Sequence, residues 1–228
     1  MRMFFSIYAA HPKDTKLCLL AEFHSSRYKR TMRIVMFGMG NVGGALARLW
    51  SAAGYDVTAA AREDRRGSAA GAGVIALCLP WSAAESVLAS CGDLTGKVLI
   101  DCTNPVTPSV DALAIGGVTS AAERIQALHP GASVVKAFNS LGAALLGDAD
   151  FNGEAADGFF CGDNASAKRA VEPLVAAAGL HPVDVGPLRN ARYLEALAML
   201  WIDLAIHRGR GPTFAFKMLT RAAEVPQR

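Results

Sequence analysis

Cysteine is scarce in this chain of 228 residues, which contains five in all. Their number is odd, none stands in a C-x-x-C spacing, and two lie inside apolar strand-like runs. This pattern excludes a disulfide framework and a zinc site, and it favours reduced, buried thiols in a cytoplasmic protein. The alternative is one reactive thiol, for which the sequence shows no neighbouring base. The five histidines also lack metal-ligand spacing, so we expect no metal. The cysteines are Cys18, Cys78, Cys91, Cys102 and Cys161.

Long hydrophobic runs are also missing, although 52% of the residues are hydrophobic. No apolar stretch reaches the roughly 18 residues that a membrane span needs. The run from Met3 to Ala10 is short and is soon followed by Pro12, unlike a signal peptide. The net charge of +3 is small, and residues 1–31 hold six basic side chains against two acidic ones. The rest of the chain has no excess of basic residues, and we expect neither a membrane nor a nucleic-acid partner.

Residues 1–31 have no sustained periodicity, and Met32 stands directly before the first apolar strand. Three explanations are open: an over-extended gene start with Met32 as the initiator, a disordered basic arm, or a weak organelle-targeting sequence. We favour the first, and a peptide from residues 1–31 in the natural protein would refute it. We therefore expect an N-terminal extension at 1–31, one domain at 32–219 and a tail at 220–228.

A glycine motif of the form G-x-G-x-x-G directly follows the apolar run Arg33–Phe37 and leads into small and apolar helix formers. This is the context of a dinucleotide-binding fingerprint. Gly38 permits a tight turn, Gly40 leaves room for a pyrophosphate, and Gly43 lets the helix approach the strand. The helix N-terminus would then face the phosphates. An ordinary glycine turn is the alternative. The predicted binding segment is Gly38, Met39, Gly40, Asn41, Val42 and Gly43.

Strand and helix patterns alternate along the rest of the chain with short connections. This alternation predicts an α/β fold, with a doubly wound, mostly parallel Rossmann sheet and a small helical C-terminal part. The ligand crevice is then expected at the carboxyl ends of the strands. After the helix near 41–53 we expect strands at 55–60, 74–79, 97–101, 133–138, 157–161 and 181–185, and helices at 82–90, 119–128, 164–178 and 189–206.

The end of the second predicted strand lacks the carboxylate that an NAD-specific site uses to bind the ribose hydroxyls. Ala59, Ala60 and Ala61 stand there, followed by Arg62. Without a carboxylate, a 2′-phosphate meets no repulsion, and the guanidinium groups of Arg62, Arg65 and Arg66 suit it. The sequence therefore favours NADP(H). The alternative is a solvated charge cluster in which Glu63 and Asp64 pair with these arginines.

Three loops at strand ends should meet near the nicotinamide ring. They contain Leu79-Pro80-Trp81, Thr103-Asn104-Pro105-Val106 and Ala137-Phe138-Asn139-Ser140. Asn104 and Asn139 can donate to and accept from the carboxamide, while Pro80 and Pro105 stiffen the approach. As alternatives, Asn-Pro is a common turn dipeptide and Asn139 is a helix cap.

Other residues near these loops have plainer explanations. Lys136 could reach the pocket, but a lysine that snorkels outward is the preferred interpretation. Trp201 could line a pocket for a planar ring, but an aromatic residue at helical spacing usually packs in the core. His129 is best explained as packing at a helix end. The residues that we name as candidates for the pocket are Asn104, Lys136, Phe138 and Asn139, and none is an evident acid or base.

From Met32 to about Leu219 the chain resembles the NADPH-dependent coenzyme F420 reductase family, also described as F420-dependent NADP oxidoreductases. The most specific matching segment is Asp184 to Arg192, followed by Leu194-Glu195 and an apolar helix. The other matching segments are Gly38 to Gly43, Ala61-Arg62 with Arg66, Leu79-Pro80-Trp81, Thr103-Asn104-Pro105, Val135 to Asn139 and Cys161-Gly162-Asp163.

The resemblance implies NADPH bound along the glycine loop, with Arg62 and Arg66 near the 2′-phosphate, and a homodimer. It also implies hydride transfer between NADPH and coenzyme F420 or a related flavin, a reaction that needs orientation more than acid–base groups. The implied cofactor-binding residues include Leu79, Pro80, Asn104, Pro105, Ala137 and Asn139.

The chain departs from the family pattern at two places, which bear on the hydride acceptor and on binding of the cofactor phosphates. The Lys136–Asn139 segment looks more like bacterial relatives and the cytosolic domain of the STEAP metalloreductases, where the ring acceptor can be an ordinary flavin such as FMN or FAD. Met39 stands where a Thr or Ser is frequent, which removes one phosphate hydrogen bond. Two other functions are open: a reductase of a small imine or carbonyl substrate, and a non-catalytic NADPH-binding redox sensor.

Overall fold

The computed structural model describes residues 32–221, so the extension at 1–31 and residues 222–228 lie outside the described residues. Its centre is a seven-stranded sheet in the order β2-β1-β3-β4-β5-β8-β9. The first five of these strands run parallel, whereas β8 pairs antiparallel with β5 and parallel with β9. The strands are β1 Arg33–Phe37, β2 Asp56–Ala59, β3 Val74–Leu77, β4 Val98–Asp101, β5 Ser133–Ala137, β8 Asp157–Gly162 and β9 His181–Asp184.

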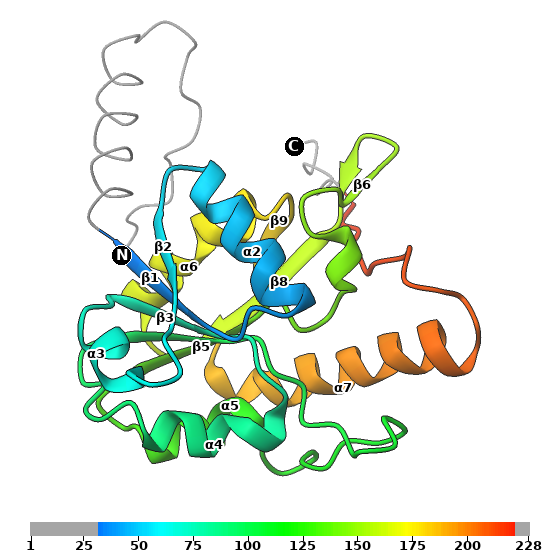
Figure 1. Ribbon diagram of the computed structural model, residues 1–228. Helices are drawn as coiled ribbons and strands as arrows, with labels where there is room; N and C mark the ends of the chain where they lie inside the picture. The colour runs from blue at the N-terminus through cyan, green and yellow to red at the C-terminus, as the bar shows by residue number, and fades with distance from the viewer. Residues whose placement is uncertain (1–31, 222–228) are drawn as a thin grey trace, which may run out of the picture.

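Helices cover both faces of the sheet, as a doubly wound fold requires. Figure 1 shows α2 Asn41–Ala52 and α6 Ala165–Ala177 together on one side, with α7 on the other. Successive side chains of a strand face opposite ways, so Ile34 and Met36 pack with α2 and α6, while Val35 and Phe37 pack into the second core. The helices of that second core are α3 Arg65–Ala70, α4 Trp81–Ala89, α5 Ala121–Leu128 and α7 Ala191–Ile202.

The predicted Rossmann architecture is confirmed, and the structure adds elements that the sequence patterns did not indicate. The helix α3 has six residues and begins where the carboxylate of Asp64 accepts a bond from the Gly67 N–H at 2.8 Å. A small hairpin, β6 Asp150–Phe151 with β7 Glu154–Ala155, lies between β5 and β8. Because no crossover helix joins β5 to β8, the chain turns back and β8 runs antiparallel to β5.

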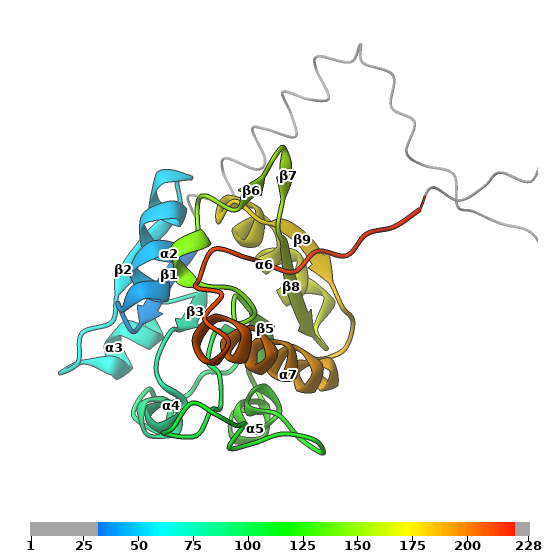
Figure 2. The same cartoon turned by 90° about the vertical axis from the view of Figure 1, so that its right-hand side faces the viewer.

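The C-terminal part consists of α7, a π-helical turn at Asp203–His207 and a returning segment without helix. The segment passes Trp201, whose ring stacks on Phe214 with centroids 5.3 Å apart and whose indole N–H donates to the Phe214 carbonyl. It then reaches β8, where the Asp157 N–H donates to the carbonyl of Phe216 (Figure 2). Trp201 therefore anchors the C-terminal segment. Within residues 32–221 no helix is long and apolar enough to cross a membrane.

Candidate active site

The strand order reverses at β1, whose neighbours are β2 and β3. The chain leaves β1 toward α2 on one face of the sheet and leaves β3 toward α4 on the other. Such a switch point opens a crevice at the carboxyl ends of the two strands, where open α/β sheets bind their ligands. The glycine motif lies at this crevice.

Two of the three motif glycines are required by the fold itself. Gly38 has a φ of +100°, and a Cβ atom there would overlap the carbonyl oxygen of Cys78. A Cβ atom on Gly43 would overlap the carbonyl oxygen of Gly38. A side chain at either position would push the loop away from β3 or α2 away from the loop, so these glycines shape the turn.

Gly40 is different, because no contact with the described residues explains it. Its φ of −71° suits any residue, and a Cβ atom there would meet no atom of residues 32–221 within 4 Å. Gly40 is also the N-cap of α2, and no side chain caps this helix. The free space and the uncapped N–H groups together form a cradle for an anion at the positive end of the helix dipole.

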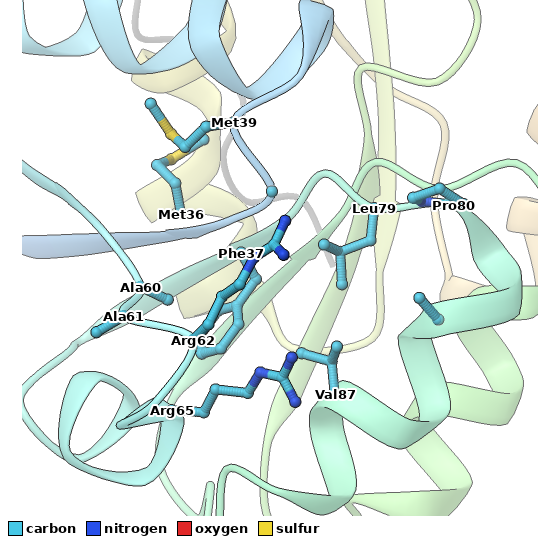
Figure 3. A pocket seen from close by; sticks show the side chains of 12 residues that line it. Met36, Phe37, Met39, Ala60, Ala61, Arg62, Arg65, Leu79, Pro80 and Val87 are labelled. Carbon is cyan, nitrogen blue, oxygen red and sulfur yellow. The ribbon is translucent and has the colours of Figure 1, made fainter.

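A cleft of about 360 Å³ continues from this loop toward the end of β2. Figure 3 shows the side chains of Arg62 and Arg65 extending into it between the glycine loop and α4. Of the described residues that line the cleft, none is acidic. The cleft thus combines two guanidinium groups with an apolar floor; its lining is Met36, Phe37, Gly38, Met39, Ala60, Ala61, Arg62, Arg65, Leu79, Pro80, Ala83 and Val87.

Arg66 does not share this position. Its side chain lies beside Gly92, where a Cβ atom would stand 3.2 Å from the Arg66 Nε. Arg65, one residue earlier on α3, lines the cleft instead. Among the ion pairs of the described chain, none joins an arginine of this turn to Glu63 or Asp64, and Asp64 caps α3. Arg66, which the resemblance places near a 2′-phosphate, is thus absent from the described lining of the cleft, whereas Arg62 and Arg65, which the sequence also named, are part of it.

The loops after β4 and β5 meet through their asparagines. The Asn104 amide donates to the Asn139 carbonyl at 3.0 Å, and the Asn139 amide donates to the Asn104 side-chain oxygen at 3.1 Å and to the Leu194 carbonyl at 3.0 Å. Two buried side-chain oxygens on these loops, Thr103 Oγ1 and Asn139 Oδ1, have no hydrogen-bond partner among the described residues. The structure therefore brings Asn104 and Asn139 together, as the sequence suggested.

The Ala137-Phe138 part of the third loop faces the core. The Phe138 ring is 3% exposed and packs edge-on against Trp50, with centroids 5.6 Å apart. Its φ of +62° is unusual for a residue with a side chain, and backbone strain of this kind gathers at functional sites. Phe138 and the buried Ala137 thus support the loop from beneath, and the turn at Phe138 directs Asn139 toward Asn104.

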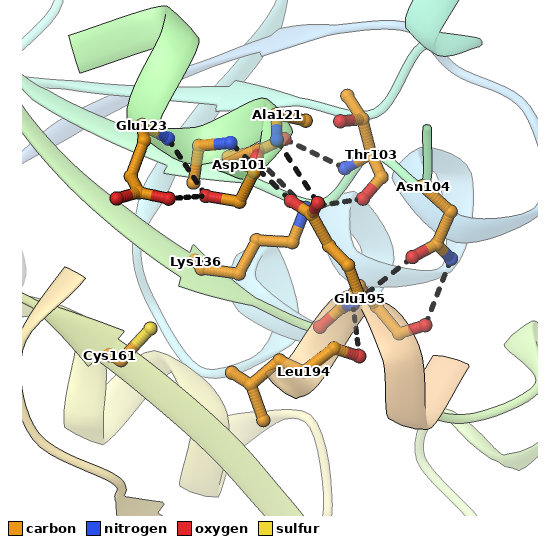
Figure 4. Close-up of polar contacts among 12 residues, drawn as sticks. Asp101, Thr103, Asn104, Ala121, Glu123, Lys136, Cys161, Leu194 and Glu195 are labelled. Atoms are coloured by element: carbon orange, nitrogen blue, oxygen red, sulfur yellow. Dashed lines mark hydrogen bonds and ion pairs between the residues drawn. The ribbon is translucent and has the colours of Figure 1, made fainter. Parts of the chain in front are cut away.

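The interpretation of Lys136 as a snorkelling residue is wrong. Its side chain is fully buried, and Figure 4 shows it directed toward Asp101 and Glu195. The Lys136 Nζ lies 2.9 Å from Asp101 Oδ2 and 3.0 Å from Glu195 Oε1, and it donates to the Thr103 carbonyl at 2.5 Å. These carboxylates raise the pKa of Lys136 although burial alone would lower it. Burial raises the pKa of Glu195, and the nearby Lys136 ammonium offsets only part of this rise.

The cysteines and His129 fit the structural roles that the sequence favoured, buried thiols and packing at a helix end. All four cysteines of the described chain are free, and burial raises the pKa of the Cys161 thiol to about 12. Cys102 is also buried and its pKa is raised, with the neighbouring Cys78 thiol as the first cause. His129 is the C-cap residue of α5, and burial lowers its pKa. Cys18 lies outside the described residues. The histidines, cysteines and carboxylates of residues 32–221 form no cluster that could hold a metal ion.

Comparisons with known proteins agree with the family that the motifs indicated. The chain is 29% identical to the F420-dependent NADP reductase of Methanothermobacter thermautotrophicus over 170 residues, which cover 71% of this chain and 73% of that protein. It is 37% identical over 117 residues, half of this chain, to the metalloreductase STEAP3 of Rattus norvegicus. The match spans 22% of the length of that metalloreductase. No family model matches the chain.

A solved structure gives the same result. A crystal structure from Arthrobacter sp. FB24, named as a candidate F420-dependent NADP-reductase, superposes with a TM-score of 0.76 at 27% identity. The superposition covers 83% of this chain and all of that one. The predicted resemblance is thus confirmed in sequence and in structure: the chain is similar to F420-dependent NADP reductases.

Proposed function

We propose that this chain is a cytoplasmic NADP(H)-dependent oxidoreductase that passes a hydride between NADPH and coenzyme F420 or a related flavin. The observation that carries the proposal is the cradle at Gly40, where the fold itself does not require a glycine. The cradle lies at an uncapped helix N-terminus and opens into the cleft that Arg62 and Arg65 line. A pyrophosphate at the cradle would extend the adenine half of a dinucleotide into that cleft.

The arginines of the cleft support the choice of NADP(H) over NAD(H). A 2′-phosphate beside Arg62 and Arg65 would gain charge-assisted hydrogen bonds, each worth about 1.5–3 kcal/mol. The ribose of NAD(H) would find no carboxylate, because Ala60 and Ala61 stand at the end of β2. Arg66 points elsewhere and serves as a matched control.

We therefore expect the double variant Arg62→Ala/Arg65→Ala to bind NADPH about 100-fold more weakly and NADH with unchanged affinity. The binding constants are measured by fluorescence titration for the wild-type chain, the double variant and Arg66→Ala. We expect Arg66→Ala to keep its NADPH affinity within about threefold, since a long-range charge is screened by salt. If the double variant lost affinity for NADPH and NADH equally, the placement of the 2′-phosphate beside Arg62 and Arg65 would be wrong.

The remaining residues of the site suit hydride transfer between stacked rings. NADPH supplies the hydride when it is bound. The paired amides of Asn104 and Asn139 provide donors and acceptors that can orient a carboxamide, and Pro80 and Leu79 give the site an apolar wall. Imine or carbonyl reduction would also need a proton donor, but the Lys136 ammonium behind these loops is fully enclosed, and its raised pKa makes it a weak acid.

Stopped-flow oxidation of NADPH with F420, FMN and FAD as separate acceptors tests the reaction. We expect turnover with at least one of these rings and none with small imines or ketones. Tight NADPH binding without oxidation by any acceptor would favour a redox sensor, and turnover only with an imine or ketone would favour the reductase of a small substrate.

We also propose that a second copy of the chain covers the outer face of α7. Tyr193, Leu197 and Leu200 recur there at helical spacing, and Tyr193 is 72% exposed. Beside them lies an apolar groove of about 280 Å³, whose other walls include Phe159 and Val185. Exposed apolar patches of this kind mark protein interfaces.

The interface is tested by the variant Tyr193→Glu/Leu200→Glu. Because it places charges on the α7 face, we expect it to sediment as a monomer under conditions where the wild-type chain sediments as a dimer. Leu128→Glu, a charge on the exposed end of α5, is the control and should leave the dimer intact. A wild-type chain that sediments as a monomer would refute the homodimer.

A further inference from the structure

The buried lysine of β5 belongs to a network that ends on both asparagine loops. The three donors of the Lys136 ammonium are taken by Asp101 Oδ2, Glu195 Oε1 and the Thr103 carbonyl. The side chains of Lys136, Asp101 and Glu195 are at most 1% exposed. A charged cluster of this depth does not touch the cleft, so any effect on a ligand must pass through the residues that it holds.

The network fixes the first loop at two backbone atoms. Asp101 Oδ1 accepts from the Thr103 N–H at 2.9 Å, and Lys136 donates to the Thr103 carbonyl. Both polar backbone groups of Thr103 are thereby held, and Asn104 follows directly in the chain. The peptide that carries the Asn104 side chain therefore starts from a fixed position.

The network reaches the second loop through α7. Glu195 accepts from the N–H groups of Ala121 at 3.0 Å and Ala122 at 3.4 Å, which ties α7 to the start of α5. The preceding residue, Leu194, offers its carbonyl to the Asn139 amide. Asn104 thus follows a residue that the network holds, Asn139 bonds to the residue before Glu195, and the two asparagines bond to each other.

Stability alone gives no reason for such a cluster. Apolar side chains of similar volume often replace a buried ion pair at no cost in stability, because desolvation offsets the attraction between the charges. The loops that the cluster holds carry two orphaned buried oxygens, Thr103 Oγ1 and Asn139 Oδ1. A buried oxygen without a donor is unfavourable, and a ligand amide could supply the missing hydrogen bond.

We propose that Lys136, Asp101 and Glu195 are positioning residues that set Asn104 and Asn139 for the carboxamide of the nicotinamide ring. The proposal rests on the function proposed above. It predicts that damage to the network weakens binding of the nicotinamide half of the cofactor and leaves the adenine half unaffected. A merely structural cluster would affect both halves alike.

The test compares two ligands on the purified full chain by calorimetric titration: NADP⁺, and 2′-phospho-ADP-ribose, which lacks the nicotinamide. For Glu195→Gln we expect the NADP⁺ affinity to fall about tenfold, to that of the fragment, and the fragment affinity to stay within twofold. Asp184→Asn, which breaks the surface pair with Lys168, is the matched control and should change neither. Thermal unfolding with and without each ligand gives an independent readout.

A second variant keeps the test decisive if Glu195→Gln does not fold. Asp101→Leu/Lys136→Met/Glu195→Leu replaces all three charges by apolar groups, so we expect it to fold and to show the same selective loss. Unchanged NADP⁺ affinity in the folded variants, or equal losses for both ligands, would overturn the positioning role alone. A wild-type chain that binds neither ligand would overturn the proposed function, and this inference with it.

Discussion

Lys136→Met is expected to lower the free energy of unfolding by about 3–5 kcal/mol, the largest loss of stability that we predict for a single substitution. The change removes the ammonium and leaves the carboxylates of Asp101 and Glu195 buried side by side. Two unpaired charges in a region of low dielectric repel each other and lose the group that replaced their hydration. Urea unfolding followed by circular dichroism measures the effect.

Lys168→Met is the matched control for this measurement. Lys168 pairs with Asp184 at 2.7 Å, but the two side chains are 19% and 44% exposed, so water screens the pair. We expect a loss of less than about 1 kcal/mol. Similar losses for both variants would mean that the Lys136 network contributes no more to stability than a surface ion pair, and the burial described above would then be wrong.

Gly40→Ala is expected to separate binding from folding. The added methyl group meets no atom of the part of the chain that the structure describes, and alanine loses less chain entropy on folding, so stability should stay the same or rise by about 0.4–1 kcal/mol. The same methyl group would occupy the space proposed for the pyrophosphate. Displacement of the pyrophosphate would cost charge-assisted hydrogen bonds of about 1.5–3 kcal/mol each, so we expect the affinity for NADPH to fall by about 100-fold.

The neighbouring glycine of α2 provides the comparison. A Cβ atom on Gly44 would make only an ordinary contact, 3.4 Å from the Met39 carbonyl oxygen, and Gly44 lies within α2 rather than at its N-cap. Gly44→Ala should therefore keep the wild-type affinity. Fluorescence titration with NADPH and thermal unfolding are measured on both variants. Normal NADPH binding by Gly40→Ala would show that no phosphate lies at the cradle.

Local patterns predicted the fold well because each signal depends on neighbours in the sequence. The apolar run before Gly38 and the alternation of strands and helices required no knowledge of distant contacts. The prediction was weaker where an element is short. The helix α3 contains Gly67 and depends on its Asp64 cap, and its turn decides which arginine faces the cleft. A shift of one residue on a helix turns the side chain by about 100°, which separates Arg65 from Arg66.

The polar network illustrates what local patterns miss. Asp101 and Lys136 each lie near the end of an apolar strand, and the register of β4 and β5 places them opposite each other. The register depends on the pairing of the two strands, which the sequence did not reveal. Glu195 offered one signal, a carboxylate between Leu194 and the apolar residues of α7, on the side of the helix that is buried. A charged residue on a buried helix face usually has a partner.

A crystal structure of the chain with NADP⁺ examines the binding mode most directly. We expect the pyrophosphate to lie against Gly40 at the start of α2, the 2′-phosphate between Arg62 and Arg65, and the carboxamide within hydrogen-bond distance of Asn104 or Asn139. A cofactor bound away from the glycine loop, or one whose 2′-phosphate does not contact Arg62 or Arg65, would refute this NADP(H) site.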